Sequence, residues 1–63
     1  MTICMTNGGM YPDVILINGK EVSGIKLEAL NEMLENDKFI TISSNKGIQK
    51  AILRTSCISS INL

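Results

Sequence analysis

The hydrophobic residues of the segment IKLEALNEMLEND recur at helical spacing. Leu27, Leu30 and Leu34 are separated by three and four residues, which places them along one stripe of an α-helix. Good helix formers occupy most positions between them. We therefore predict a single helix over about residues 25–36, with Ser23 as its N-cap.

The opposite face of this predicted helix is acidic. Glu28, Glu32 and Glu35 all lie on it, and Glu28 and Glu32 are like charges one turn apart. A run of charge on a helix usually marks a face exposed to solvent, and we favour that interpretation. The alternative is an acidic docking surface for a basic partner.

Most of the remaining chain alternates between apolar and polar residues, or is apolar over a few positions, as β-strands are. Such patterns cover residues 2–6, 13–17, 20–22, 38–44, 48–54 and 57–63. The segment 13–17 is apolar on both faces, which predicts a strand covered on both sides. Asn18-Gly19 predicts a type I′ hairpin turn, and Asn45-Lys46-Gly47 predicts a second turn. Residues 1–10 fit either an edge strand or a flexible segment.

These elements predict an α+β fold for one domain of residues 1–63. The predicted order is three strands, the helix and three strands. Short turns favour antiparallel neighbours, so we expect one small sheet of about four to six strands with the helix packed on one face.

The chain has more apolar residues than one helix and one sheet face can cover, at 44% of the sequence. In the C-terminal strands, apolar side chains are expected on both faces, and Ile61 is expected on the face opposite Ile58. We therefore predict a homo-oligomer, most simply a dimer joined through these strands. The candidate interface residues are Phe39, Ile48, Ile52, Ile61 and Leu63.

Charge is unevenly distributed along a chain of zero net charge. Residues 1–37 hold all six acidic residues and two basic ones, a balance of −4, and residues 38–63 hold four basic residues, a balance of +4. We favour contact between the two halves, within one chain or across a dimer. The alternative is a nucleic-acid surface formed by Lys46, Lys50 and Arg54. Such binding would be weak and non-specific, because Phe39 is the only aromatic residue of that half.

Several kinds of chemistry are missing from the sequence. The chain has no histidine, the commonest general base, and its two cysteines, Cys4 and Cys57, have no metal-binding spacing. We therefore expect no catalytic site, no cofactor and no metal. The longest apolar run, Val14–Ile17, is too short to span a membrane, and the N-terminus does not resemble a signal peptide. We expect a cytoplasmic protein with reduced thiols.

Together these features favour a small non-enzymatic interaction protein that forms a homo-oligomer and binds or inhibits a larger macromolecule. In size and composition the chain is similar in type to the small accessory proteins of phages and mobile elements, a likeness that transfers no residue roles. Two alternatives stay open. One is the nucleic-acid-binding module, and the other is an oligomer that sequesters a small molecule or nucleotide near Asn7-Gly8-Gly9 or the basic strands.

Overall fold

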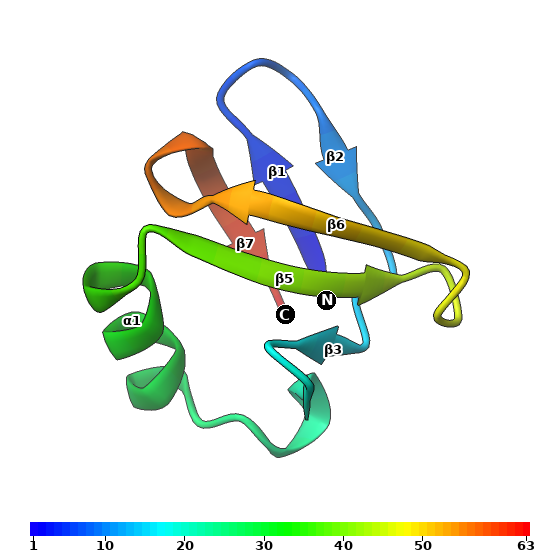
Figure 1. Cartoon of the computed structure of the whole chain (residues 1–63), viewed down its shortest axis with the longest axis horizontal. Helices are drawn as coiled ribbons and strands as arrows, with labels where there is room; N and C mark the ends of the chain where they lie inside the picture. Colours follow the sequence, from blue (N-terminus) through cyan, green and yellow to red (C-terminus); the bar gives the residue numbers. More distant parts are fainter.

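The chain has the predicted α+β class, in a computed structural model that describes residues 1–63 (Figure 1). The elements are β1 (Thr2–Met5), β2 (Met10–Tyr11), β3 (Leu16–Ile17), β4 (Lys20–Glu21), α1 (Leu27–Asn36), β5 (Phe39–Ser44), β6 (Gln49–Arg54) and β7 (Ile58–Asn62). They form two antiparallel sheets, one with the order β2-β1-β7 and one with the order β4-β3-β5-β6. The sequence predicted a single sheet and did not predict β2.

The chain passes from the first sheet to the second between β2 and β3. Tyr11 pairs with Ile3 in the first sheet, and Leu16 pairs with Ser43 in the second. Between them, Pro12 has no backbone N–H, and Asp13 has a positive φ of 54°. These two residues interrupt the extended run, so the strand predicted over 13–17 is reduced to Leu16–Ile17.

The core lies between the two sheets and α1, and it is entirely aliphatic. Its seven buried side chains are Ile3, Val14, Ile17, Leu30, Ile40, Ile42 and Leu53. Complete burial of one such side chain stabilises a fold by about 1.5–3 kcal/mol. Of the predicted apolar stripe of α1, Leu30 is buried in this set and Leu34 packs against it, whereas Leu27 is 60% exposed.

α1 begins two residues later than predicted, and Ser23 is not its N-cap. Val22–Gly24 instead forms a short 3₁₀ helix, which is closed by a hydrogen bond of 3.2 Å from the Ile25 N–H to the Val22 carbonyl. Lys26 occupies the N-cap position, and its side chain makes no capping hydrogen bond. The predicted end at Asn36 is confirmed.

Both predicted turns are present. Asn18 and Gly19 have φ angles of 51° and 79°, and positive values at both positions are what a type I′ turn requires. The Asn18 side chain also accepts a hydrogen bond of 2.9 Å from the Thr41 N–H, which ties this turn to β5. Asn45, Lys46 and Gly47 all have positive φ in the turn between β5 and β6.

β7 contains an irregularity that changes the direction of its side chains. Its register with β1 pairs Met5 with Ile58 and Cys4 with Ser60, so Ser59 is an extra residue opposite no partner. Such a bulge resets the alternation of a strand. As a result Ile58 and Ile61 both pack against the core, and the prediction that they lie on opposite faces is wrong.

Candidate interaction surface

The side of the second sheet that faces away from the core forms a mixed apolar and basic surface. Three cross-strand pairs of β5 and β6 make it up, and we call these six residues the outer face: Phe39 with Arg54, Thr41 with Ile52, and Ser43 with Lys50. Their neighbours Ile40, Ile42 and Leu53 point inward and are buried. The predicted division of these strands into two faces is therefore confirmed.

Large apolar side chains on the outer face are open to solvent. Ile52 is 71% exposed and Phe39 is 51% exposed. Ile48, in the turn that precedes β6, is 82% exposed. Aromatic and aliphatic side chains beside arginine are typical of protein-binding surfaces.

Arg54 lies over the ring of Phe39, with 5.6 Å between its guanidinium carbon and the ring centroid. An exposed cation–π contact of this kind stabilises by about 0.5–1 kcal/mol and restrains both side chains. The sequence identifies Phe39 only as the one aromatic residue of that half and does not place it beside Arg54. The turn at Asn45–Gly47 could have indicated this contact, because the hairpin that the turn closes pairs residue 39 with residue 54.

Two open hollows lie on this side of the molecule. One, of about 450 Å³, lies between Leu16, Thr41, Lys50 and Ile52. The other, of about 340 Å³, has a more polar lining: Lys38, Phe39, Arg54, Thr55 and Ser56. Each hollow combines a cation with an apolar side chain, which suits a partner that carries negative charge.

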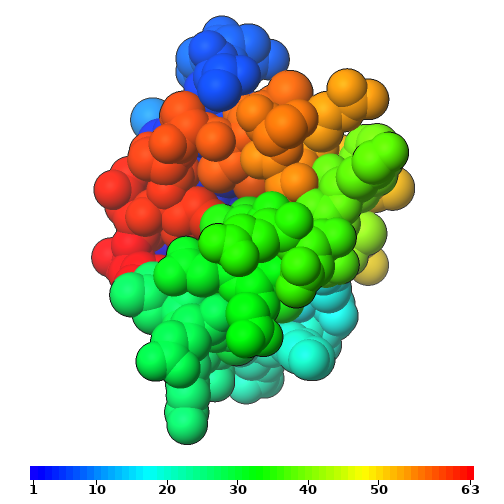
Figure 2. All heavy atoms as spheres, turned by 90° about the vertical axis from the view of Figure 1, so that its left-hand side faces the viewer, coloured from blue at the N-terminus to red at the C-terminus, as the bar shows by residue number.

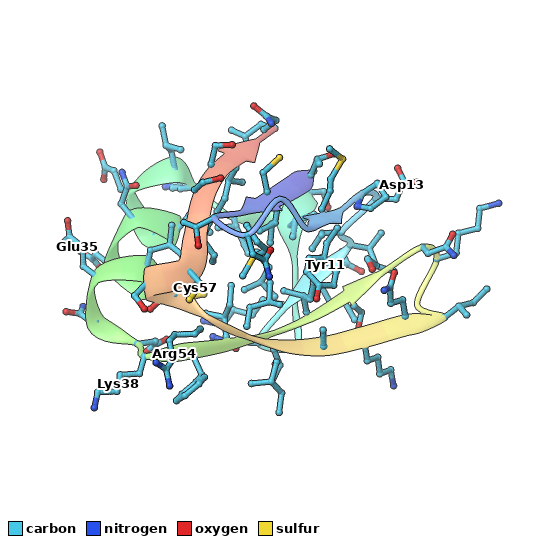
Figure 3. The ribbon with its side chains drawn as sticks, turned by 90° about the horizontal axis from the view of Figure 1, so that it is seen from above. Tyr11, Asp13, Glu35, Lys38, Arg54 and Cys57 are labelled. Carbon is cyan, nitrogen blue, oxygen red and sulfur yellow. The ribbon has the colours of Figure 1, made fainter.

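The predicted basic residues lie on one hairpin. Lys50 and Arg54 project from β6 on the outer face, and Lys46 is exposed in the turn. The predicted acidic residues Glu28 and Glu35 are exposed on α1. Figure 3 shows Glu35 directed outward from α1, at the same end of the molecule as Lys38 and Arg54 but pointing in a different direction.

Glu32 is also exposed on α1, so all three predicted acidic residues are open to solvent. No salt bridge joins an acidic to a basic side chain within the chain. The two halves nevertheless pack against each other inside one molecule, because β1 pairs with β7 and β3 pairs with β5.

The five predicted interface residues do not form one surface. Phe39 and Ile52 lie on the outer face, and Ile48 lies at the end of the hairpin. Ile61 is half-buried and packs against the core, whereas Leu63 is 82% exposed beside α1. The sequence could not separate these residues, because it gave no sign of a second sheet.

A third surface lies where α1 meets β7 (Figure 2). It is a groove of about 270 Å³, lined by six hydrophobic residues and three polar ones. We call it the α1–β7 groove, and its hydrophobic residues are Leu27, Leu30, Leu34, Ile58, Ile61 and Leu63. Leu27 and Leu63 are its most exposed members, at 60% and 82%.

The loop between β1 and β2, suggested as a small-molecule site, closes on itself. The Asn7 side chain accepts a hydrogen bond of 2.8 Å from the Gly9 N–H, and the Gly9 carbonyl accepts one of 2.8 Å from the Met5 N–H. Both cysteines are free. No cluster of three or more His, Cys, Asp or Glu residues has the arrangement of a metal site.

No helix of the structure has the length and apolar character needed to cross a membrane. Comparison of the chain with models of protein families, with curated proteins and with solved structures finds no significant match.

Proposed function

We propose that this is a small, cytoplasmic, non-enzymatic interaction protein that binds a larger macromolecule through its outer face and acts as a homodimer. One observation carries the proposal: Phe39 and Ile52 are exposed side by side with Lys50 and Arg54. Leaving such side chains in water forgoes the free energy of their burial, about 1.5–3 kcal/mol each. A partner that covers them recovers it.

The composition and the placement of polar groups support a role without catalysis. The sequence has no histidine, and the helix carboxylates are exposed to solvent on α1 and line none of the hollows described above. The free thiols of Cys4 and Cys57 suit the reducing conditions of the cytoplasm.

Self-association is better suited to the α1–β7 groove than to the outer face. The groove has a mostly hydrophobic lining and offers two exposed leucines, Leu27 and Leu63. A two-fold contact through the outer face would instead bring Lys50 and Arg54 of both copies together, and like charges would oppose it. Dimerisation at the groove leaves the outer face free for the partner.

The test is affinity capture from a lysate followed by mass spectrometry, repeated with variants. We expect Phe39→Ser and Ile52→Ser to lose the proteins that the parent captures. Met10→Ser is the matched control, because Met10 is 62% exposed on β2 and lies outside the outer face. The proposal fails if the parent captures nothing specific, or if all three variants capture the same proteins as the parent.

Nucleic-acid binding is the second candidate, and the contact between Arg54 and Phe39 is the observation that favours it. Single-stranded nucleic acids bind where bases stack on an aromatic ring beside cationic groups. Fluorescence anisotropy with a labelled oligonucleotide tests it. Binding that weakens steeply with salt and is lost in Phe39→Ser would favour this function over the first.

A further inference from the structure

We propose that the free edge of β6 binds an extended segment of a partner protein as an added antiparallel strand, and that this segment carries acidic, apolar and acidic residues at three alternate positions. The inference rests on the proposed function, because it specifies the partner of the same surface. It is carried by the hydrogen-bonding pattern of β5 and β6 and by the charges on β6.

The direction of the backbone groups in β5 follows from its contacts with the segment around β3. The Thr41 carbonyl accepts a hydrogen bond of 2.8 Å from the Asn18 N–H, and the Ser43 carbonyl accepts one of 2.8 Å from the Ile15 N–H. Backbone groups of successive residues in a strand point to opposite edges. Ile40 and Ile42 therefore direct theirs toward β6.

Ile40 and Ile42 pair with Leu53 and Ala51 of β6. The hydrogen bond of 2.9 Å from the Thr55 N–H to the Lys38 carbonyl continues the same ladder. Gln49, Ala51 and Leu53 thus direct their backbone groups toward β5.

The alternate residues of β6, Lys50, Ile52 and Arg54, direct their N–H and C=O groups away from β5. β6 is the last strand of its sheet, and no other strand pairs with it. Arg54 is also the N-cap of the 3₁₀ helix Thr55–Cys57, so its C=O accepts the first hydrogen bond of that helix. The free edge therefore presents three donors and two acceptors over about 14 Å, which is a template for an added strand.

The side chains of these three residues determine which strand would fit. Lys50, Ile52 and Arg54 all project on the outer face in the order basic, apolar, basic. Cross-strand neighbours on one face interact directly. An added strand is therefore best matched when the residues opposite them are acidic, apolar and acidic.

A second copy of this chain does not meet that requirement. If β6 paired antiparallel with β6 of a second copy, centred on Ile52, the Lys50 side chain of each copy would lie opposite the Arg54 side chain of the other. If the two β6 strands were shifted along each other by one pair of residues, Lys50 and Arg54 of both copies would still lie together on one face. Lysine on an edge strand discourages pairing between copies, and here the same charges attract an acidic strand.

The other free edges are weaker templates. β2 and β4 have two residues each, and β7 offers serine and asparagine in place of charge. β6 has six residues, and its three exposed cross-strand positions carry a consistent charge pattern. The edge of β6 is therefore the one that the observations favour.

The test uses a blocked seven-residue peptide, Thr-Glu-Thr-Val-Thr-Glu-Thr, titrated into ¹⁵N-labelled protein and followed by NMR. We expect the amide signals of Lys50, Ile52 and Arg54 to shift and their hydrogen exchange to slow. The double variant Lys50→Glu with Arg54→Glu should bind the peptide about tenfold or more weakly and should prefer a version with lysine in place of glutamate. Lys20→Glu on β4, which reverses one charge away from β6, should bind like the parent.

A further variant separates edge pairing from simple attraction of charge. Ile52→Pro removes one N–H donor from the free edge and none of the hydrogen bonds between β5 and β6. Edge strands tolerate a proline at such a position. We expect the fold to persist, as shown by circular dichroism, and binding of the peptide to be lost. The proposal is overturned if Ile52→Pro binds as the parent does, or if charge reversal leaves the affinity unchanged.

Other occupants of the edge would give distinct results. If the three amide signals shift with protein concentration alone, a second copy occupies the edge. If a single-stranded oligonucleotide shifts them and the peptide does not, the ligand is a nucleic acid. Either result overturns the proposal. Capture through Phe39 and Ile52 would still support the broader function if the peptide failed to bind.

Discussion

Leu30 is the one residue of α1 that is fully buried in the core, at 3% exposed, and Met33 and Leu34 pack against the core beside it. We predict that Leu30→Asp abolishes cooperative unfolding. A buried, unpaired carboxylate costs about 3–5 kcal/mol, which is comparable with the whole stability that a core of this size supplies. Thermal unfolding followed by circular dichroism measures the effect.

Glu32→Lys provides the control for this substitution. Glu32 is exposed on the same helix, so its replacement is expected to change stability by no more than about 0.5 kcal/mol. If Leu30→Asp melts at the temperature of Glu32→Lys, α1 does not pack against the core as described.

The hairpin of β3 and β4 depends on the backbone conformation at its turn. Gly19 has a φ of 79°, whereas Gly24 does not adopt positive φ, and both have open space where a side chain would start. We predict that Gly19→Ala destabilises by about 1–2 kcal/mol, because left-handed backbone is strained in alanine. Gly24→Ala adds the same atoms without that strain and should be neutral or slightly stabilising.

Differential scanning calorimetry distinguishes the two variants. A cost of 1 kcal/mol lowers the melting temperature of a domain this small by about 4–8 °C. Equal melting temperatures for Gly19→Ala and Gly24→Ala would mean that strain at residue 19 contributes nothing to stability.

Local chemistry was sufficient to predict most of the elements, although not β2, and interactions between distant residues were not predictable. Asn18-Gly19 fixes its turn by conformational preference, and Leu27, Leu30 and Leu34 fix the helix by their spacing. The division into two sheets depends on Asp13, whose positive φ could not be foreseen because aspartate adopts it only in context.

The candidate site was predicted in part for the same reason. The alternation of β6 was sufficient to place Lys50, Ile52 and Arg54 on one face. The free edge of β6 was not predictable, because it depends on the order of strands in the sheet. The bulge at Ser59 was also missed, since serine there gives no local signal of an extra residue.

At the scale of the whole molecule, we predict a homodimer formed through the α1–β7 groove. Sedimentation equilibrium at micromolar concentration should give twice the chain mass of 6.9 kDa. The double variant Leu27→Ser with Leu63→Ser should be a folded monomer, because both side chains are exposed and removing them leaves the core intact. A monomeric parent contradicts the prediction.

The matched control for the interface is Ile52→Ser, which removes one exposed side chain from the outer face and should stay dimeric. If Ile52→Ser dissociates and the leucine variant does not, the dimer forms through β6. Deleting residues 59–63 is less informative, because it removes most of β7, the partner of β1, and should unfold the domain.

The pairing of β1 with β7 also constrains how the chain reaches its native state. Thr2 lies opposite Asn62, so the first sheet joins residues that are almost the whole chain apart. Closing so long a loop carries an entropic cost that is not recovered until β7 has been synthesised. The hairpin of β5 and β6 closes through a short turn and is available earlier. We therefore expect the second sheet to form first during biosynthesis, and β1 to keep an unpaired edge, open to chaperones or to aggregation, until the last strand arrives.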